Sequence, residues 1–205
     1  MSDLIKFNTE EVVKSGSYVK PIDIFALVNE DDPILWEGTK EFDFENPPVN
    51  PNEFASTLVE TCKAKSGFGL AAPQCGFNYR VFVMGAGDEY IACYNPSIIA
   101  ETSERSMIAE GCLSFPMLAL KVSRPKSIQV EYYDFNGVKH EAKFENLSSH
   151  IFQHEMDHLN GITYLSKAKP LALKYGLNKR KKFHTLVDRY NKAQKHKENL
   201  LKISP

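Results

Sequence analysis

Residues 153–158, with the sequence QHEMDH, constrain this chain more than any other segment. Two histidines four residues apart lie on one face of a helix, so the imidazoles of His154 and His158 can bind one cation. The carboxylate of Glu155 lies beside them and can accept a proton from water at that cation. Nitrogen ligands next to a proton acceptor are typical of a metal-dependent hydrolase, and the alternative is a chance match in a structural helix.

A catalytic divalent site usually takes three protein ligands, and here the third has to come from upstream. The common metalloprotease pattern would place a third histidine where this chain has Tyr164, and the next glutamate after Glu155 is Glu198. Upstream, the sequence EGCLS contains Cys112, whose thiolate would be a soft anionic ligand beside two imidazoles. An isolated cysteine is also commonly a buried apolar thiol, so the residues alone leave both interpretations of Cys112 open.

A third segment with a chemical signature is GFGLAAPQ, residues 67–74. Its glycines permit close approach of the backbone to a ligand, and Gln74 carries a neutral amide donor; the alternative is a simple turn. We expect this stretch to interrupt regular structure and to be too small and flexible for a core element. It lacks the Lys-Ser/Thr ending of a phosphate-binding loop.

The hydrophobic periodicity predicts a mixed α+β domain. The expected elements are a helix over about 52–65, strands over 79–85, 89–95, 127–135 and 138–144, and a helix over 147–160. Gly87-Asp88 and Asn136-Gly137 each mark a tight hairpin, and Gly161 marks the end of the histidine-bearing helix. Residues 41–52 are acidic and contain three prolines, which is typical of a loop.

The composition is that of a globular domain, because 42% of the 205 residues are apolar and 25% are charged. This excludes a wholly disordered chain, a collagen-like fibre and a disulfide-stapled miniprotein. No stretch approaches the roughly 18 apolar residues of a membrane span, and the N-terminus lacks the pattern of a secretory signal. We therefore expect no membrane contact, and thiols that stay reduced at Cys62, Cys75, Cys93 and Cys112.

The charge is distributed asymmetrically along the chain. Residues 167–205 hold 12 lysines and arginines against 2 acidic residues, whereas the first 166 residues hold 13 basic and 24 acidic residues. The pattern predicts an amphipathic basic helix with an apolar stripe of Leu177, Phe183, Leu186, Val187, Tyr190 and Leu200. Such a segment suits an anionic partner such as nucleic acid, and the alternative is a solvated helix face. Three regions are expected: an extension over 1–30, a catalytic domain over 31–166 and a basic helical tail over 167–205.

The segments GFGLAAPQ, EGCLS and QHEMDH, in this order and spacing, resemble the peptide deformylases. The similarity runs from about Asp32 to Leu165. It implies an α+β fold in which a central metal-binding helix packs against antiparallel sheets, followed by a C-terminal helix. The implied activity is that of a metallo-amidohydrolase that removes the N-formyl group from the formyl-methionine of nascent polypeptides and releases formate. The implied partners are N-formyl-methionyl peptides and, through the basic tail, the ribosome, in the cytoplasm of a bacterial or an infected host cell.

The same resemblance implies a role for individual residues. Cys112, His154 and His158 would bind one divalent metal ion per chain, with Fe(II) expected in the cell and zinc, nickel or cobalt accepted in purified protein. Glu155 would act as general base and then as acid, while the Gln74 amide and the Leu113 backbone N–H would stabilise the formyl oxygen. The expected substrate-binding residues are Gly69, which would pair with the peptide backbone, and Phe68, Ile108, Leu147, His150 and Ile151, which would line the methionine pocket. Glu110 is also expected to be a substrate-binding residue. In addition, it is expected to form an ion pair with Arg124.

Three positions depart from the pattern of these enzymes. His150 replaces an apolar residue one helical turn before His154; it is interpreted as a polar pocket wall rather than a fourth ligand, which would close the open metal position. Ala119 stands where many members have an arginine that meets the substrate. Asn146 replaces a glycine, and asparagine also tolerates positive φ. Two competing hypotheses are a metallopeptidase and an inactive RNA-binding domain.

Overall fold

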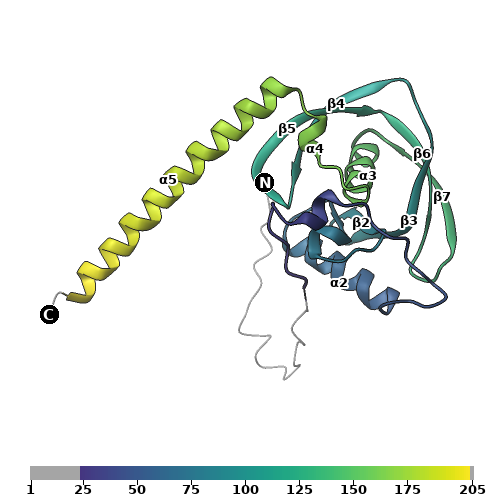
Figure 1. Cartoon of the computed structure of the whole chain (residues 1–205), viewed down its shortest axis with the longest axis horizontal. Coiled ribbons are helices and arrows are strands. Elements are labelled where there is room, and N and C mark those ends of the chain that lie inside the picture. Colours follow the sequence, from purple (N-terminus) through teal and green to yellow (C-terminus); the bar gives the residue numbers. More distant parts are fainter. Residues whose placement is uncertain (1–23, 204–205) are drawn as a thin grey trace, which may run out of the picture.

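The structure is a computed structural model that describes residues 24–203, with side chains described as far as residue 195 (Figure 1). Most of the expected extension over 1–30 lies outside the described residues. The elements in chain order are η1 (Pro33–Trp36), α2 (Pro51–Ala64), β1 (Gly69–Ala71), η2 (Ala72–Cys75), β2 (Val81–Ala86), β3 (Glu89–Glu101), β4 (Arg105–Cys112), β5 (Phe115–Pro125), β6 (Ser127–Tyr133), β7 (Lys139–Glu145), α3 (Asn146–Leu159), α4 (Tyr164–Lys167) and α5 (Pro170–Ile203). This mixture of antiparallel sheets and helices confirms the predicted α+β class. Among the described helices, none combines the length and the apolar character needed to cross a bilayer.

Two antiparallel sheets frame the domain. The larger sheet has the strand order β1-β2-β3-β6-β7, and β4 and β5 form a separate hairpin. Both predicted hairpins are confirmed, one joining β2 to β3 and one joining β6 to β7, where Asp134 N–H donates to Val138 O. Because β1 lies at the end of the strand order, one of its edges stays available for pairing.

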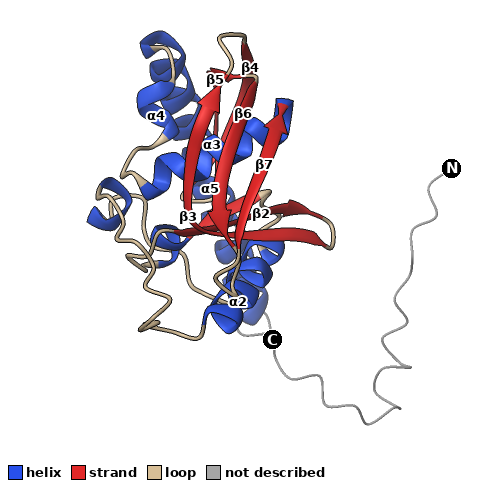
Figure 2. Cartoon of the chain, turned by 90° about the vertical axis from the view of Figure 1, so that its right-hand side faces the viewer, coloured by secondary structure: helices blue, strands red, loops and turns tan. Residues whose placement is uncertain are grey.

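Helix α3 lies between the two sheets and contacts strands of both (Figures 1 and 2). Its apolar side, with Phe152, Met156 and Leu159, packs on the larger sheet together with residues such as Phe82 and Val130. The other side carries the polar residues of the QHEMDH segment, and these are buried as well. A helix that buries both of its faces is held in one position, which suits it to carry metal ligands.

The two ends of α3 follow the sequence prediction closely. Asn146 opens the helix with a φ of 53°, as its tolerance of positive φ predicts. Gly161 follows the helix with a φ of 68°, and a Cβ there would overlap with the backbone of Glu37. Within the helix, Gln153 Nε2 donates to the Pro125 carbonyl at 3.0 Å, which fixes α3 to the end of β5.

The expectation that residues 66–76 interrupt regular structure and stay out of the core is wrong. Residues 69–71 form β1, in register with β2 from Gly69 opposite Met84 to Ala71 opposite Phe82. Leu70, Ala71 and Ala72 are fully buried. A strand of three residues is too short to show a periodic pattern, and its order comes from hydrogen bonds to a neighbouring strand.

The described end of the N-terminal segment lies against the domain. Phe25 N–H donates to Thr61 Oγ1 of α2 at 2.9 Å, and Val28 N–H donates to the Gln74 carbonyl at 3.0 Å. The Phe25 ring also packs against Phe54. The segment therefore braces η2, which carries Gln74.

The predicted C-terminal helix is confirmed as α5, which projects away from the domain (Figure 1). Its first turns contact β5. The predicted apolar stripe does not pack against the domain, because Leu177, Phe183, Leu186, Val187 and Tyr190 are exposed. The side chain of Leu200 lies outside the described side chains.

Candidate metal centre

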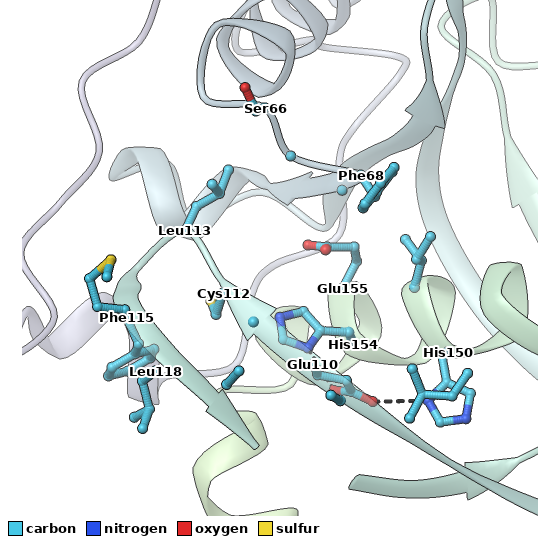
Figure 3. A pocket seen from close by; sticks show the side chains of 18 of the residues that line it. Ser66, Phe68, Glu110, Cys112, Leu113, Phe115, Leu118, His150, His154 and Glu155 are labelled. Atoms are coloured by element: carbon cyan, nitrogen blue, oxygen red, sulfur yellow. Dashed lines mark hydrogen bonds and ion pairs between the residues drawn. The ribbon is translucent and has the colours of Figure 1, made fainter. Parts of the chain in front are cut away.

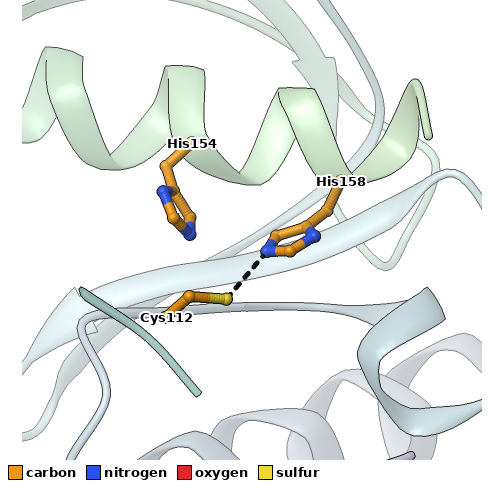
Figure 4. Close-up of side chains that lie close together, drawn as sticks. All are labelled: Cys112, His154 and His158. Atoms are coloured by element: carbon orange, nitrogen blue, oxygen red, sulfur yellow. Dashed lines mark hydrogen bonds between the residues drawn. The ribbon is translucent and has the colours of Figure 1, made fainter. Parts of the chain in front are cut away.

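Three side chains from two distant segments converge beside α3 (Figure 4). Cys112 ends β4, while His154 and His158 lie one turn apart on α3. Their ligand atoms all lie within 4.8 Å of one another, and Cys112 Sγ is 3.2 Å from His158 Nε2. Within residues 24–195, whose side chains are described, this is the one group of at least three histidine, cysteine or acidic side chains close enough to share an ion. A thiolate with two imidazoles is a donor set for iron, cobalt, nickel or zinc, so the residues fit a divalent transition metal.

A buried carboxylate orients one of the two histidines. Glu110 Oε2 accepts a hydrogen bond from His154 Nδ1 at 3.0 Å. This bond fixes the imidazole tautomer and leaves Nε2 for a metal ion. Arg124 in turn donates to Glu110 through Nε at 2.6 Å and through Nη2 at 2.9 Å, so the predicted ion pair between Glu110 and Arg124 is confirmed.

Arg124 also reaches the next turn of α3. Its Nη1 donates to Asp157 Oδ2 at 2.7 Å, and Lys167 Nζ lies 3.1 Å from the other oxygen of Asp157. One guanidinium thus joins the two strands of the β4–β5 hairpin through Glu110 and links this hairpin to α3 through Asp157. Arg124, Glu110 and Asp157 are all buried residues, so salt screens these pairs only weakly.

Burial and pairing shift several pKa values in the site. Burial raises the pKa of Glu110, but its bonds with Arg124 and His154 outweigh burial and lower this pKa to about 2. Burial lowers the pKa of His154, but contacts with Cys112 and Glu110 outweigh it and raise this pKa to about 10. Burial, with a contribution from His154, holds the pKa of His158 well below its usual range. Glu110 is therefore charged at neutral pH, as a partner for His154 must be.

Glu155 is buried under β1. Burial raises the pKa of its carboxyl to about 7, with only partial compensation from His154 and Arg124. Its Oε2 has no hydrogen-bond partner among the described residues. A Cβ at Gly69 would overlap with this carboxylate, so β1 can lie this close only because residue 69 is glycine.

Gln74 points its amide nitrogen toward the ligand group. Its Oε1 accepts from the Ala71 N–H at 2.9 Å, which fixes the orientation of the amide. Nε2 donates to Ser114 Oγ at 3.1 Å and lies 3.4 Å from Cys112 Sγ. The donor end of Gln74 is therefore held beside the ligands.

His150 is bound at both ring nitrogens. Nδ1 donates to Glu110 Oε1 at 3.1 Å, and Nε2 lies 2.8 Å from Ser106 Oγ. The imidazole is fully buried and lies outside the ligand group. This arrangement agrees with a polar pocket wall and leaves no nitrogen for a metal. Ser106 carried no signal in the sequence, because its role depends on the unpredicted β4.

A pocket of about 660 Å³ opens in front of the ligand group (Figure 3). Of the predicted site residues it is lined by Phe68, Gly69, Gln74, Ile108, Glu110, Cys112, Leu113, Leu147, His150, Ile151, His154 and Glu155. His158 lies behind it and completes the ligand group. Both carboxylate oxygens of Glu110 accept hydrogen bonds from Arg124, His150 and His154. These bonds indicate that Glu110 orients the two histidines rather than binding the substrate itself.

Tyr164 occupies the position of a third histidine in the metalloprotease pattern, and it is not a ligand here. Its hydroxyl donates to the Leu118 carbonyl at 2.8 Å, and its ring packs 5.5 Å from that of His154.

Four further residues that line the pocket carried no signal in the sequence. They are Met117 and Leu118 of β5 and Gly176 and Lys179 of α5.

The chain matches the model of the polypeptide deformylase family over residues 24–174. It belongs to this family. A peptide deformylase of Thermotoga maritima is 37% identical over 142 residues, which are 68% of this chain and 84% of the relative. A solved peptide deformylase of Synechococcus elongatus in complex with actinonin superposes with a TM-score of 0.71 at 30% identity, over 76% of this chain and 85% of that one. A class I type b enzyme of Acinetobacter baumannii with bound Met-Ala-Ser has a TM-score of 0.67 at 26% identity, over 71% of this chain and 98% of that one.

Membership in the family fixes the activity. The chain is a hydrolase that removes the N-formyl group from nascent polypeptides, and enzymes of this family depend on a metal ion. The hypotheses of a metallopeptidase and of an inactive RNA-binding domain are therefore set aside.

Replacing Arg124 by alanine should destabilise the fold by about 3–5 kcal/mol, because Glu110 and Asp157 would keep buried charges without their guanidinium partner. Urea unfolding of the metal-loaded protein measures this loss. Lys126→Ala, which breaks the more exposed pair with Glu104, is the matched control and should cost less than about 1 kcal/mol. Equal losses in the two variants would contradict the linking role of Arg124.

Proposed function

We propose that Cys112, His154 and His158 hold one divalent metal ion, Fe(II) in the cell, and that Glu155 moves the protons of the deformylation reaction. The observation that carries this proposal is the convergence of one thiol and two imidazoles beside a buried carboxylate whose Oε2 has no partner in the described part of the chain. When bound, the ion supplies Lewis acidity, which lowers the pKa of water and polarises a carbonyl.

The side chain of Glu155 transfers protons, and Gln74 and the Leu113 backbone stabilise the transition state. Glu155 accepts a proton from the attacking water and returns it to the leaving amine, so that formate and a free N-terminus result. Its raised pKa suits a group that takes up and releases a proton near neutral pH. Gln74 Nε2 and the Leu113 backbone N–H stabilise the negative charge that develops on the formyl oxygen.

The peptide binds along the free edge of β1. Its backbone pairs with the backbone around Gly69, which reads an extended shape without reading side chains. The methionine side chain enters the part of the pocket lined by Phe68, Ile108, Leu147, His150 and Ile151. Support comes from the relative of Acinetobacter baumannii, whose structure holds Met-Ala-Ser.

Replacing Glu155 by glutamine should keep the metal and lower kcat by about 10²–10⁴-fold, because the amide cannot accept the proton. The measurement is formate release from formyl-Met-Ala-Ser, together with metal analysis of protein purified without oxygen. His158→Ala is the companion variant and should lose both metal and activity. Wild-type turnover in Glu155→Gln would refute the proton-transfer role, and an ion other than iron in the anaerobic protein would refute the choice of metal.

Replacing Gln74 by alanine should lower kcat by about 10²–10³-fold with a smaller change in KM, because the donor acts on charge that forms in the transition state. Steady-state kinetics with formyl-Met-Ala-Ser separate the two constants. Gln74 also caps β1 through its bond to Ala71, so thermal unfolding must show that the variant is folded. A folded Gln74→Ala protein with an unchanged kcat would rule out the role.

We also infer that the basic tail, residues 167–205, docks the enzyme on translating ribosomes in the cytoplasm of a bacterial or an infected host cell. Support comes from its 12 basic residues and from the projection of α5 away from the domain. The exposed side chains of Arg189, Lys192 and Lys195 are available to an anionic surface.

Reversing the charge at Arg189, Lys192 and Lys195 to glutamate should reduce co-sedimentation with ribosomes at low salt, because phosphate contacts dominate such binding. The matched control reverses three exposed lysines of the domain, Lys65, Lys121 and Lys143. Deformylation of short peptides should persist in both triple variants. Equal loss of co-sedimentation in both would show that net charge, and not the tail, governs the binding.

A further inference from the structure

A lysine of α5 lines the same pocket as the metal ligands. Gly176 and Lys179 contribute to its wall, next to Met117, Leu118 and Ala119 of β5. Among the lining residues in the described part of the chain, Lys179 is the one lysine or arginine. It lies beyond residue 174, where the match to the family model ends.

The first turns of α5 are fixed against the domain, so Lys179 is held at a defined place. Leu173 packs against the apolar cluster that contains Leu118 and Leu120. At Gly176, a Cβ would lie 2.9 Å from a methyl group of each of these two leucines, so a larger residue would require these side chains or the helix to shift. Arg180 forms an ion pair with Glu30 on the other side of Lys179.

Lys179 itself stays free to bind. Its side chain is exposed, and no hydrogen bond or ion pair joins it to any other described residue. The neighbouring Arg180 is occupied by Glu30, and the guanidinium of Arg124 is occupied by Glu110 and Asp157. The small side chain of Ala119, which lines the same wall, carries no charge that would compete. A peptide in the pocket therefore meets one mobile ammonium group on this wall.

We propose that Lys179 is a specificity-determining residue that binds a carboxylate of the peptide, located after the formyl-methionine. In a nascent chain this carboxylate belongs to an aspartate or glutamate side chain; in a short peptide it is also the terminal carboxylate. The inference rests on the proposed function, because it takes the pocket as the site of the formyl-peptide. An acidic residue near the start of a chain would lower KM and leave kcat unchanged, since Lys179 does not touch the reacting atoms.

The test compares KM and kcat of the full chain on four substrates. Three are amidated peptides, formyl-Met-Ala-Ser, formyl-Met-Ala-Asp and formyl-Met-Ala-Lys; the fourth is formyl-Met-Ala-Ser with a free carboxylate. In the wild type, KM should be about two- to fivefold lower for the aspartate peptide than for the neutral amide, as expected for one solvent-exposed ion pair. The preference should disappear at about 1 M salt, where the Debye length is about 3 Å.

Variants of Lys179 separate its charge from its structural contribution. Lys179→Ala should abolish the preference, Lys179→Glu should reverse it toward the lysine peptide, and Lys179→Arg should retain it. All three residues are good helix formers, so α5 should stay folded. Lys181→Ala is the matched control, because residue 181 is exposed and lies about 200° further around the helix. It should keep the wild-type preference.

The outcomes distinguish this inference from the proposed function. Absence of formate release from all four peptides would overturn the function itself. Formate release with equal KM values for the aspartate and neutral amides, in the wild type and in Lys179→Ala, would overturn only the role of Lys179. A lower KM that is seen only with the free terminal carboxylate would overturn the role of Lys179 for nascent chains, because the growing end of a nascent chain lies far from the pocket. If the preference for the aspartate peptide survives in Lys179→Ala but is lost in Lys181→Ala, the proposal has assigned the preference to the wrong residue.

Discussion

The buried pair of Glu110 and Arg124 is the interaction on which the rest of the site depends. A carboxylate that is taken out of water needs partners for its charge, and Glu110 finds them on both β5 and α3. The strand that carries Glu110 ends two residues later at Cys112, past an irregularity in its pairing with β5, and both side chains reach histidines of α3. By binding His154 and Arg124 at once, Glu110 therefore sets where the sulfur of Cys112 lies relative to the imidazoles. The three proposed metal ligands meet because an ion pair behind them aligns the hairpin with the helix.

The same arrangement explains why α3 can be so polar and yet lie in the interior. Arg124 holds Glu110 of β4 and Asp157 of α3, while the Pro125 carbonyl accepts from Gln153 and Ser149. These bonds replace the contacts with water that Asp157, Gln153 and Ser149 lose on burial. Glu155 differs, since one of its oxygens has no partner in the described part of the chain and burial raises its pKa. A helix that these bonds hold in place can keep one carboxylate in a costly environment, which is where a proton-transfer group is expected.

The sequence predicted most of what depends on local pattern and little of what depends on pairing between distant segments. The helix of His154 and His158, the two hairpins and the ending at Gly161 follow from periodicity and turn residues. Cys112 lies 42 residues before His154, a separation that carries no geometric information, so only the resemblance to deformylases assigned it. Strand β1 is three residues long, and the β4–β5 hairpin lacks a clear turn signal, so both were missed. The hydrogen-bond partners of His150 and the contribution of α5 to the pocket were missed for the same reason.

Helix α5 shows how one element can act differently along its length. Near its start, Leu173 and Gly176 fit it closely against β5, so this part belongs to the domain and to the pocket wall. Further along, the apolar residues Phe183, Leu186 and Tyr190 are exposed and the surrounding residues are basic. Basic side chains that extend from Lys179 at the pocket along a projecting helix would attract acidic peptides at one end and anionic surfaces at the other. Because the first 166 residues carry a net negative charge, this attraction would be confined to the side of the enzyme on which α5 lies. The sign of the charge on α5 would thus serve both the docking of the enzyme and the choice of its substrates.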